Sequence, residues 1–227
     1  MLLTNIEDSV HQHRIASISK INPRKWLKQI QINSFTMMDK CEWCKDGGIM
    51  EHYHDTEWGI PCHNDKMLYE YLMLECMSAG LSWKLMLQKR DIFKACFADF
   101  DFNKVTTFTD ADVVQILQYP DMIRSKKKIE AIISNARCYI KIRDEYGSFD
   151  RYIWSFTDNK TIIYQRHLDG EWLTTSELSN KIAKDLKKRG YKFLGSTLIY
   201  SYLQGIGVIN DHLTYCNMFD KIGGVIV

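Results

Sequence analysis

The hydrophobic positions of the chain recur at helical spacing from about residue 65 onward. The first clear apolar face, at the i, i+3, i+4, i+7 and i+8 spacing of one buried helix surface, consists of Leu68, Tyr71, Leu72, Glu75 and Cys76. Gly80 is expected to end this helix, and Trp83 to begin the next. Glu75 is thus a carboxylate on a stripe that faces the core, which is costly unless a partner is present.

Other segments repeat the helical pattern. The predicted helices lie after a Thr109-x-x-Asp112 capping box, over residues 126–145, after a Thr174-x-x-Glu177 capping box, and over residues 196–206. Residues 158–173 follow no period and are predicted to be loop. With three prolines and no run of alternating strand patterns, the chain is predicted to be all-α.

Composition separates the chain into a core region and two flanks. Residues 1–36 are polar and aperiodic, so we expect a poorly ordered extension, and one hypothesis places the natural start at Met37 or Met38. The globular domain is assigned to residues 37–220 and a tail to residues 221–227. The sequence shows no secretory h-region and no run of about 18 apolar residues, so we expect a cytoplasmic protein without membrane contact. The seven cysteines are an odd number, so we expect reduced thiols rather than a disulfide framework. We also expect a monomer.

Glu75 next to Trp83 is the main candidate for chemistry. A carboxylate beside a large aromatic face suits a flat, electron-poor ring. The alternative is a glutamate near a helix end that accepts a hydrogen bond from a backbone group. A carboxylate nearer to a substrate sugar could act in catalysis, and Asp211 is a second candidate for that role.

Cysteine and histidine gather at both ends of the domain. His212 and Cys216 stand at i and i+4, where one helical turn would direct both to one ion. The N-terminal candidates for the other two ligands are Cys41, Cys44, His52, His54, Cys62 and His63. Two ligands from each end would make a tetrahedral Cys2His2 zinc site with a structural role. The alternative is that these cysteines are small buried apolar side chains.

A basic segment lies between the last two predicted helices. Its sequence runs from Lys187 to Thr197, with the candidate DNA-binding residues Lys188, Arg189, Gly190, Lys192 and Gly195. A Gly-bounded turn exposes backbone N–H groups at the start of the second helix, and nearby cations attract phosphate. This layout is typical of a helix-hairpin-helix element, although a solvated turn with a glycine C-cap has the same pattern. The first turn of the second helix offers no lysine for a Schiff base.

Seven short motifs carry a resemblance to a known family. In chain order they are Tyr53-His54-Asp55-x-Glu57-Trp58-Gly59-x-Pro61, Leu74-Glu75, Ala79-Gly80-Leu81-Ser82-Trp83, Lys128-Ile129-x-Ala131-Ile132-Ile133-x-Asn135-Ala136-Arg137, Trp154-Ser155-Phe156, Leu186-Lys187-Lys188-Arg189-Gly190-x-Lys192-Phe193-x-Gly195 and Asn210-Asp211-His212. Residues 41–216 therefore resemble the 3-methyladenine DNA glycosylase I family of the helix-hairpin-helix superfamily.

The resemblance implies roles for particular residues. It implies that Cys41, His54, His212 and Cys216 bind zinc, and that Glu75 hydrogen-bonds a methylated base in a pocket formed by Tyr53, Trp58 and Trp83. It also implies an enzyme that flips 3-methyladenine out of double-stranded DNA and hydrolyses its N-glycosidic bond. Such an enzyme is monofunctional, without AP lyase activity and without a redox or nucleotide cofactor.

Two positions depart from the family pattern. Met50 replaces an aromatic residue three positions before Tyr53, and Ser78 replaces a glutamine before Ala79. Both changes bear on which alkylated base is bound. Three alternatives therefore stay open: a glycosylase for a bulkier alkylated purine, a non-catalytic zinc-stabilised DNA-binding domain, and a purely structural zinc domain.

Overall fold

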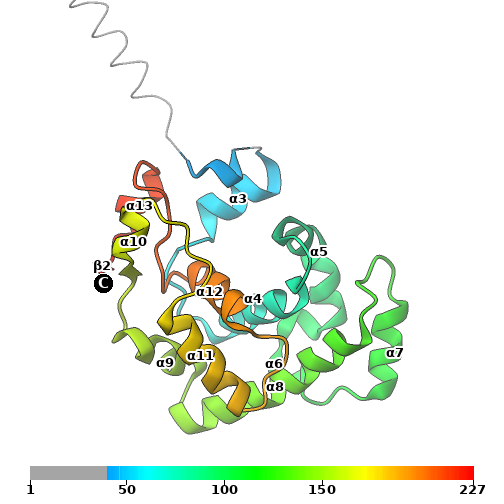
Figure 1. The fold of residues 1–227 in the computed structure, drawn as a ribbon. Helices are drawn as coiled ribbons and strands as arrows, with labels where there is room; N and C mark the ends of the chain where they lie inside the picture. The colour runs from blue at the N-terminus through cyan, green and yellow to red at the C-terminus, as the bar shows by residue number, and fades with distance from the viewer. Residues whose placement is uncertain (1–39, 46) are drawn as a thin grey trace, which may run out of the picture. The chain divides into compact units, whose positions relative to one another are not determined.

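The computed structural model describes residues 40–45 and 47–227, so the predicted extension over residues 1–36 lies outside the described residues. The described chain is mostly helical, as the sequence predicted (Figure 1). In chain order the elements are η1 (Glu42–Cys44), α3 (Gly48–Thr56), α4 (Asp65–Ser78), α5 (Trp83–Cys96), η2 (Ala98–Phe100), α6 (Phe102–Val105), α7 (Asp110–Gln118), α8 (Lys126–Tyr146), α9 (Phe149–Trp154), η3 (Ser155–Thr157), β1 (Ile162–Ile163), α10 (Gln165–Leu168), α11 (Glu177–Lys188), α12 (Ser196–Gly205), α13 (Asn217–Ile222) and β2 (Val225–Ile226).

Helix α4 is the central element of the domain. Every residue from Leu68 to Ser78 is buried, because α5, α8, α9 and α12 all pack against this helix. The helix and the burial of the five predicted residues are therefore confirmed, but the prediction is incomplete because the residues between them are buried too. Asn64 Oδ1 caps its start by accepting the Met67 N–H at 3.1 Å. The chain turns at Gly80, with a φ of +77°, and α5 begins at Trp83 as predicted.

Helix α11 begins two residues later than its sequence predicts. The cap is Ser176 rather than Thr174: Ser176 Oγ accepts the Ser179 N–H at 3.1 Å, and Ser179 Oγ accepts the Ser176 N–H at 2.8 Å. Ser179 is fully buried and lies 2.9 Å from Ser196 Oγ at the start of α12. Packing against α12 therefore decides where α11 starts. By contrast, the predicted capping box before α7 is confirmed, with Asp112 accepting the Thr109 N–H at 2.7 Å.

The segment 158–173, predicted to be loop, contains β1 and α10. Strand β1 pairs in parallel with β2, with Ile162 opposite Val225. Residues 221–227, assigned to a tail, hold the end of α13 and β2. Two-residue strands are too short to show a period, which is why the sequence does not reveal them.

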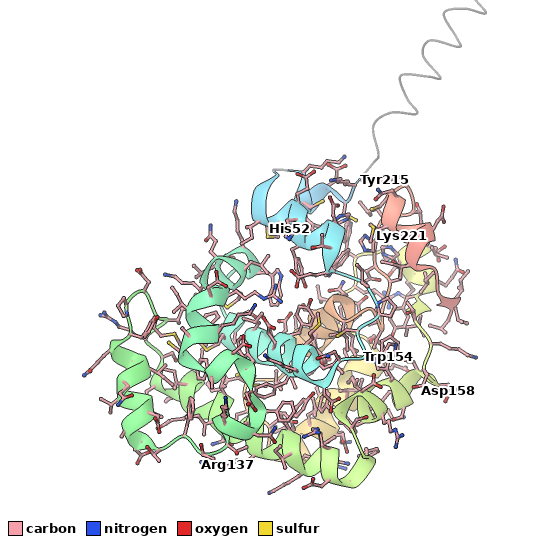
Figure 2. All side chains as sticks on the ribbon, turned by 180° about the vertical axis from the view of Figure 1, so that it is seen from behind. His52, Arg137, Trp154, Asp158, Tyr215 and Lys221 are labelled. Atoms are coloured by element: carbon pink, nitrogen blue, oxygen red, sulfur yellow. The ribbon has the colours of Figure 1, made fainter. Side chains whose placement is uncertain are left out.

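The C-terminal segment returns to the region where the described chain begins. Figure 2 shows His52, Tyr215 and Lys221 at the same end of the domain, with Arg137 at the other end. The Tyr215 hydroxyl donates to Glu42 Oε1 at 2.9 Å across this junction. None of the described helices is long and apolar enough to cross a membrane.

Candidate active site and metal cluster

A cavity of about 320 Å³ opens beside the C-terminal end of α4. Its walls are mainly aromatic, and its polar groups come from α4, α10, α12 and the segment between α12 and α13. The residues that line it are Trp43, Met50, Tyr53, Trp58, Glu75, Trp83, His167, Trp172, Leu173, Ser201, Gln204 and Asp211. The structure thus brings Glu75, Tyr53, Trp58 and Trp83, the predicted pocket residues, to one cavity.

Aromatic rings surround the space that Glu75 faces. The Tyr53 and Trp83 rings lie 5.6 Å apart at an angle of 50°. Trp58 meets Trp43 edge to face at 5.0 Å. Such mutually tilted rings leave flat faces that an aromatic guest can stack on.

Glu75 is buried, with 5% of its surface exposed. Burial raises the pKa of its carboxyl group to about 8, and a hydrogen bond from Ser78 Oγ at 3.1 Å opposes part of that rise. No described backbone N–H donates to this carboxyl group, so the structure gives no support to a capping role. At pH 7 the empty cavity therefore holds a mainly protonated acid, and a cationic guest would favour its ionised form.

Several cavity residues carry no clear sequence signal. Trp43 is one, and its position between Cys41 and Cys44 could have marked it as part of the same segment. Gln204 and Ser201 lie on the polar side of α12. The apolar periodicity of this helix predicts only its opposite, buried face, so it gives no signal for these two residues. Trp172 is 73% exposed at the cavity, in the segment taken as loop.

Of the two departures from the family pattern, one lines the cavity and the other contacts Glu75. Met50 lines the cavity and replaces a flat ring with a flexible apolar chain. Ser78 donates its hydroxyl to the Glu75 carboxylate at 3.1 Å and to the Glu75 carbonyl at 2.9 Å. Its hydroxyl is therefore directed at Glu75.

Asp211 is a second carboxylate in the cavity wall. Its Oδ2 accepts hydrogen bonds from Tyr200 at 2.5 Å and from Gln204 at 2.7 Å. Its Oδ1 is buried without a hydrogen-bond partner in the described part of the chain, and His167 Nδ1 lies 3.8 Å away. The group is held firmly, so it has a fixed position relative to Glu75.

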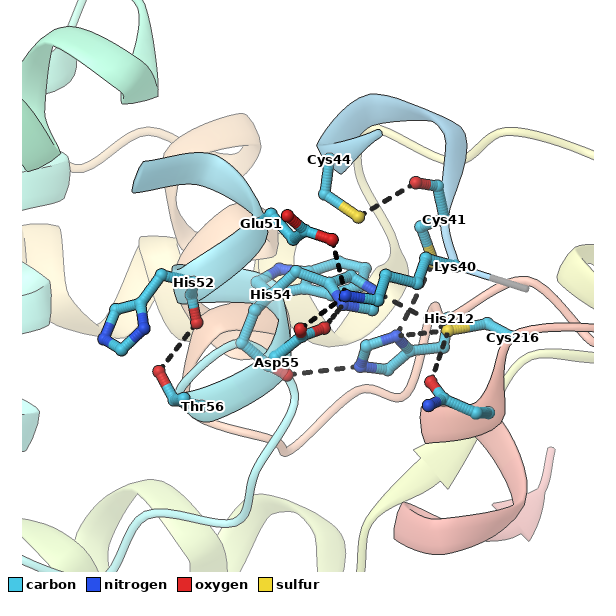
Figure 3. A network of polar contacts seen from close by, with 12 residues as sticks. Lys40, Cys41, Cys44, Glu51, His52, His54, Asp55, Thr56, His212 and Cys216 are labelled. Carbon is cyan, nitrogen blue, oxygen red and sulfur yellow. Dashed lines mark hydrogen bonds and ion pairs between the residues drawn. The ribbon is translucent and has the colours of Figure 1, made fainter. Parts of the chain in front are cut away.

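A cluster of two cysteines and two histidines forms the second site. Cys41, His54, His212 and Cys216 are buried, and their ligand atoms all lie within 4.8 Å of one another. Cys216 Sγ is 3.4 Å from His54 Nε2, and both sulfurs are 3.6 Å from His212 Nδ1 (Figure 3). Tetrahedral bonds of about 2.3 Å to sulfur and about 2.0–2.1 Å to nitrogen give S···N edges of about 3.6 Å. The cluster therefore has the size of a tetrahedral site for one metal ion.

The second nitrogen of each histidine is held by another group. His54 Nδ1 lies 2.8 Å from Asp55 Oδ1, and His212 Nε2 lies 3.2 Å from the Trp58 carbonyl oxygen. Lys40 in turn donates to Asp55 at 2.6 Å. These contacts direct His54 Nε2 and His212 Nδ1 toward the sulfurs, which is the usual arrangement of metal-binding histidines.

The competing N-terminal candidates lie outside the cluster. The Cys44 thiol donates to the Cys41 carbonyl oxygen at 3.0 Å, and the exposed His52 ring points away from the cluster (Figure 3). His63 stacks on Trp154, with ring centroids 4.6 Å apart. Cys62 is buried beside that region, and all the cysteines of the described chain are free and buried.

The predicted helical turn from His212 to Cys216 is wrong. Residues 211–216 form an irregular turn before α13, with the Cys216 N–H donating to Leu213 O at 2.7 Å. A tight turn brings the two side chains together as a helix would. The His212 N–H donates to Asn210 Oδ1 at 3.2 Å, which helps to fix the turn.

The basic segment forms a turn between α11 and α12, which pack side by side (Figure 1). Gly190 has a φ of +96° and donates its N–H to Lys187 O at 3.1 Å, so it caps α11. Gly195 precedes the first residue of α12. The Lys188 and Lys192 side chains are exposed, and no carboxylate of the described residues lies within ion-pair distance of either.

Arg189 occupies a different environment from these lysines. Its guanidinium donates to Glu145 at 2.6 Å and to Asp185 at 2.6 Å, and it stacks over the Tyr146 and Tyr152 rings. The N–H groups of its guanidinium therefore bind carboxylates of α8 and α11. The structure does not support Arg189 as a phosphate ligand, although the sequence predicts that role.

Comparison with known proteins agrees with this geometry. The family model described as methyladenine glycosylase matches residues 43–220. DNA-3-methyladenine glycosylase 1 of Escherichia coli strain K12 is 39% identical over 79% of this chain and 96% of its own length, and the Haemophilus influenzae enzyme is 36% identical over 79% and 97%. The 3-methyladenine DNA glycosylase I structure from Staphylococcus aureus, described as the basis of 3-methyladenine recognition, is 34% identical over 79% of this chain and 96% of its own, with a TM-score of 0.74.

A buried acid in an aromatic cavity within a helical domain, together with these matches, defines an enzyme of the glycosylase class. The chain belongs to the methyladenine glycosylase family.

Proposed function

We propose that this chain is a monofunctional DNA glycosylase that flips 3-methyladenine out of double-stranded DNA and hydrolyses its N-glycosidic bond. The observation that carries this proposal is Glu75, an acid with a raised pKa in a cavity lined by five tryptophan and tyrosine side chains, in a chain of this family. The relatives named for 3-methyladenine support the choice of base.

The cavity can compensate for the cost of base flipping. Extrusion of a base from the duplex costs a few kcal/mol of stacking and pairing. Stacking on an aromatic side chain returns about 1–3 kcal/mol per base. Trp58, Trp83 and Tyr53 can offset much of the cost for any purine, so stacking alone does not select the damaged base.

Charge provides the selection. Methylation at N3 makes the nucleobase cationic, and an ionised carboxylate about 4 Å away at an effective dielectric constant of about 20 contributes about 4 kcal/mol. Ionising Glu75 at pH 7 from a pKa of about 8 costs about 1.4 kcal/mol of this gain. Nearly 3 kcal/mol remains for the cationic base, and neutral adenine receives none of it.

Glu75 is assigned mainly to recognition. During cleavage the positive charge moves from the base to the sugar, so an anion beside the base stabilises the bound lesion at least as much as the transition state. The weak bond of the damaged nucleotide supplies most of the reactivity. Asp211, whose carboxylate lies in the same cavity wall, is our candidate for the carboxylate nearer to the sugar.

The lack of a lysine among the described residues that line the cavity supports monofunctional chemistry. AP lyase activity requires a nucleophilic amine that forms a Schiff base with the sugar. No lysine lines the cavity in the described part of the chain, and the first turn of α12 reads Ser196-Thr197-Leu198. Water is therefore the acceptor of the sugar.

Zinc is the metal that we assign to Cys41, His54, His212 and Cys216. Two thiolates and two imidazoles in tetrahedral arrangement are typical of structural zinc sites. All four positions are filled by protein, so the ion ties the segment at residue 41 to that at residues 212–216 and leaves no position for a reacting water. Burial raises the pKa of Cys41 to about 12, so zinc must displace a proton there and affinity falls at low pH.

The turn between α11 and α12 is assigned to the DNA backbone as a helix-hairpin-helix element. Lys188 and Lys192 supply charge, while Gly190 and Gly195 let the backbone come close to phosphate. Arg189 holds the turn on α8 rather than contacting DNA.

Alanine substitution of Lys188 or Lys192 is expected to weaken duplex binding at every sequence. Each loss should reduce the slope of log affinity against log salt by about 0.9, because one fewer counterion is released. Fluorescence anisotropy of a labelled duplex over a salt series measures this slope. Lys221→Ala, an exposed lysine on α13, is the control and should leave the slope unchanged. Unchanged slopes in both hairpin variants would remove the turn from the DNA-binding surface.

Release of free bases from methylated DNA tests the function directly. DNA treated with a methylating agent is incubated with the protein, and 3-methyladenine is separated from 7-methylguanine by chromatography. The proposal predicts release of 3-methyladenine with little 7-methylguanine. Preferential release of bulkier alkylated purines would favour the alternative glycosylase to which the departures at Met50 and Ser78 point. No release at all would indicate a binding domain.

A further inference from the structure

Asn135 on α8 is a fully buried polar residue that neither the cavity nor the metal cluster uses. Its side chain makes two hydrogen bonds with one residue of the hairpin. The Lys192 N–H donates to Asn135 Oδ1 at 2.9 Å, and Asn135 Nδ2 donates to the Lys192 carbonyl oxygen at 3.1 Å. An amide that pairs with both backbone groups of one turn residue fixes the position and the orientation of that turn.

The same amide reaches the helix that carries Glu75. Asn135 Nδ2 lies 3.9 Å from Cys76 Sγ, and Cys76 Sγ lies 3.8 Å from the Lys192 carbonyl oxygen. Cys76 directly follows Glu75 on α4. Asn135 therefore stands where the hairpin meets the helix of the candidate base-binding acid.

A second residue on the same face of α8 makes a similar contact. Lys128 precedes Asn135 by two helical turns, and its Nζ donates to the carbonyl oxygens of Met77 at 2.8 Å and Ala79 at 2.7 Å. These carbonyls lie at the C-terminal end of α4, two and four residues after Glu75. Because α8 rises about 1.5 Å per residue, the two contacts hold the end of α4 and the hairpin about 10 Å apart along one rigid helix.

We propose that Asn135 is a positioning residue that fixes the hairpin relative to the base pocket. The proposal rests on the proposed function, in which the hairpin holds DNA phosphates and the cavity holds the flipped base. The flipped nucleotide, with or without its base, is covalently joined to those phosphates, so a displaced hairpin misplaces that nucleotide relative to the cavity. A free base has no phosphate and is indifferent to this displacement.

The test compares a duplex ligand with a pocket ligand. The duplex carries one tetrahydrofuran abasic site, and the pocket ligand is 3,9-dimethyladenine, a cationic base without sugar or phosphate. Asn135→Ala is expected to weaken duplex binding about tenfold, since it leaves two backbone groups of Lys192 unpaired, and to change the affinity for 3,9-dimethyladenine less than twofold.

Tyr139→Phe is the matched control. It removes a hydrogen bond of 2.6 Å from a buried side chain of the same helix to the Asp65 carbonyl oxygen, at the far end of α4. It should lower stability comparably and leave both affinities unchanged. If Asn135→Ala does not fold, Asn135→Asp carries the comparison, because it keeps the acceptor for the Lys192 N–H and loses the amide donor.

Two results would overturn the proposal. One is an equal loss of both affinities in the folded Asn135 variant, which would mean a general structural role. The other is duplex binding as tight as in the wild type. If the Lys188 and Lys192 variants also bind the duplex normally, the hairpin assignment in the proposed function fails as well; if they bind it weakly, only the role of Asn135 fails.

Discussion

Replacement of Glu75 by glutamine is expected to weaken the binding of 3-methyladenine in DNA about a hundredfold at pH 7, seen as a higher half-saturation concentration with little change in the rate of cleavage. The glutamine keeps the shape of the side chain but loses the charge. The loss corresponds to the nearly 3 kcal/mol that remains after Glu75 has been ionised from its pKa of about 8. Single-turnover kinetics on a duplex with one lesion measures the effect. Affinity for a duplex with undamaged adenine should not change, because that base is neutral.

Ser78→Ala is the matched control for this variant. It keeps the carboxylate and removes the hydrogen bond that holds its pKa down. The lesion preference should fall at pH 7 and recover above pH 8, as Glu75 ionises without help from Ser78. In Glu75→Gln the preference should stay low at every pH. Full discrimination between 3-methyladenine and adenine in Glu75→Gln would overturn the assignment of this residue.

Loss of one metal ligand is expected to have the largest effect on stability. Cys216→Ser should abolish stoichiometric zinc binding and lower the free energy of unfolding by several kcal/mol, because the binding energy of a structural zinc ion is part of the folding energy. Metal analysis and thermal unfolding, before and after chelation, measure both quantities. The C-terminal segment, which pairs β2 with β1, should lose protection from hydrogen exchange first.

Cys44→Ser is the control for Cys216→Ser, because it replaces a buried cysteine that is not a predicted metal ligand. Cys44 is as buried as Cys216 but donates its thiol to a backbone carbonyl instead of facing the cluster. This variant should keep one zinc ion per chain and stay sensitive to chelation. Zinc retained in Cys216→Ser, or lost in Cys44→Ser, would contradict the ligand set.

The sequence predicts the helices that have strong periodicity or local caps. The helix before Gly80, the capping box at Thr109 and the long helix over residues 126–145 are confirmed, because their signals are local in the chain. The start of α11 is wrong because a contact between Ser179 and Ser196 of another helix selects the cap. The burial of α4 on all sides also depends on neighbours that periodicity within one helix does not describe.

For the site residues too, the sequence predicts what depends on neighbours in the chain but not what depends on contacts between distant segments. Spacing proposed His212 and Cys216 as a pair, but it offered six candidates for their partners, and only the fold brings Cys41 and His54 to them. In the sequence, Arg189 is one of several cations in a basic segment. In the structure, it forms ion pairs with Glu145 of α8 and Asp185 of α11. Which charges are paired is a property of the packing.

Glu75 is expected to take up its negative charge when a cationic base binds. Calorimetric titration with 3,9-dimethyladenine in two buffers of different ionisation enthalpy measures the protons released on binding. With a pKa of about 8 in the empty cavity, the wild type should release nearly one proton per site at pH 7, much less at pH 9, and Glu75→Gln should release none. Binding without proton release at pH 7, or equal release in wild type and Glu75→Gln, would contradict the account.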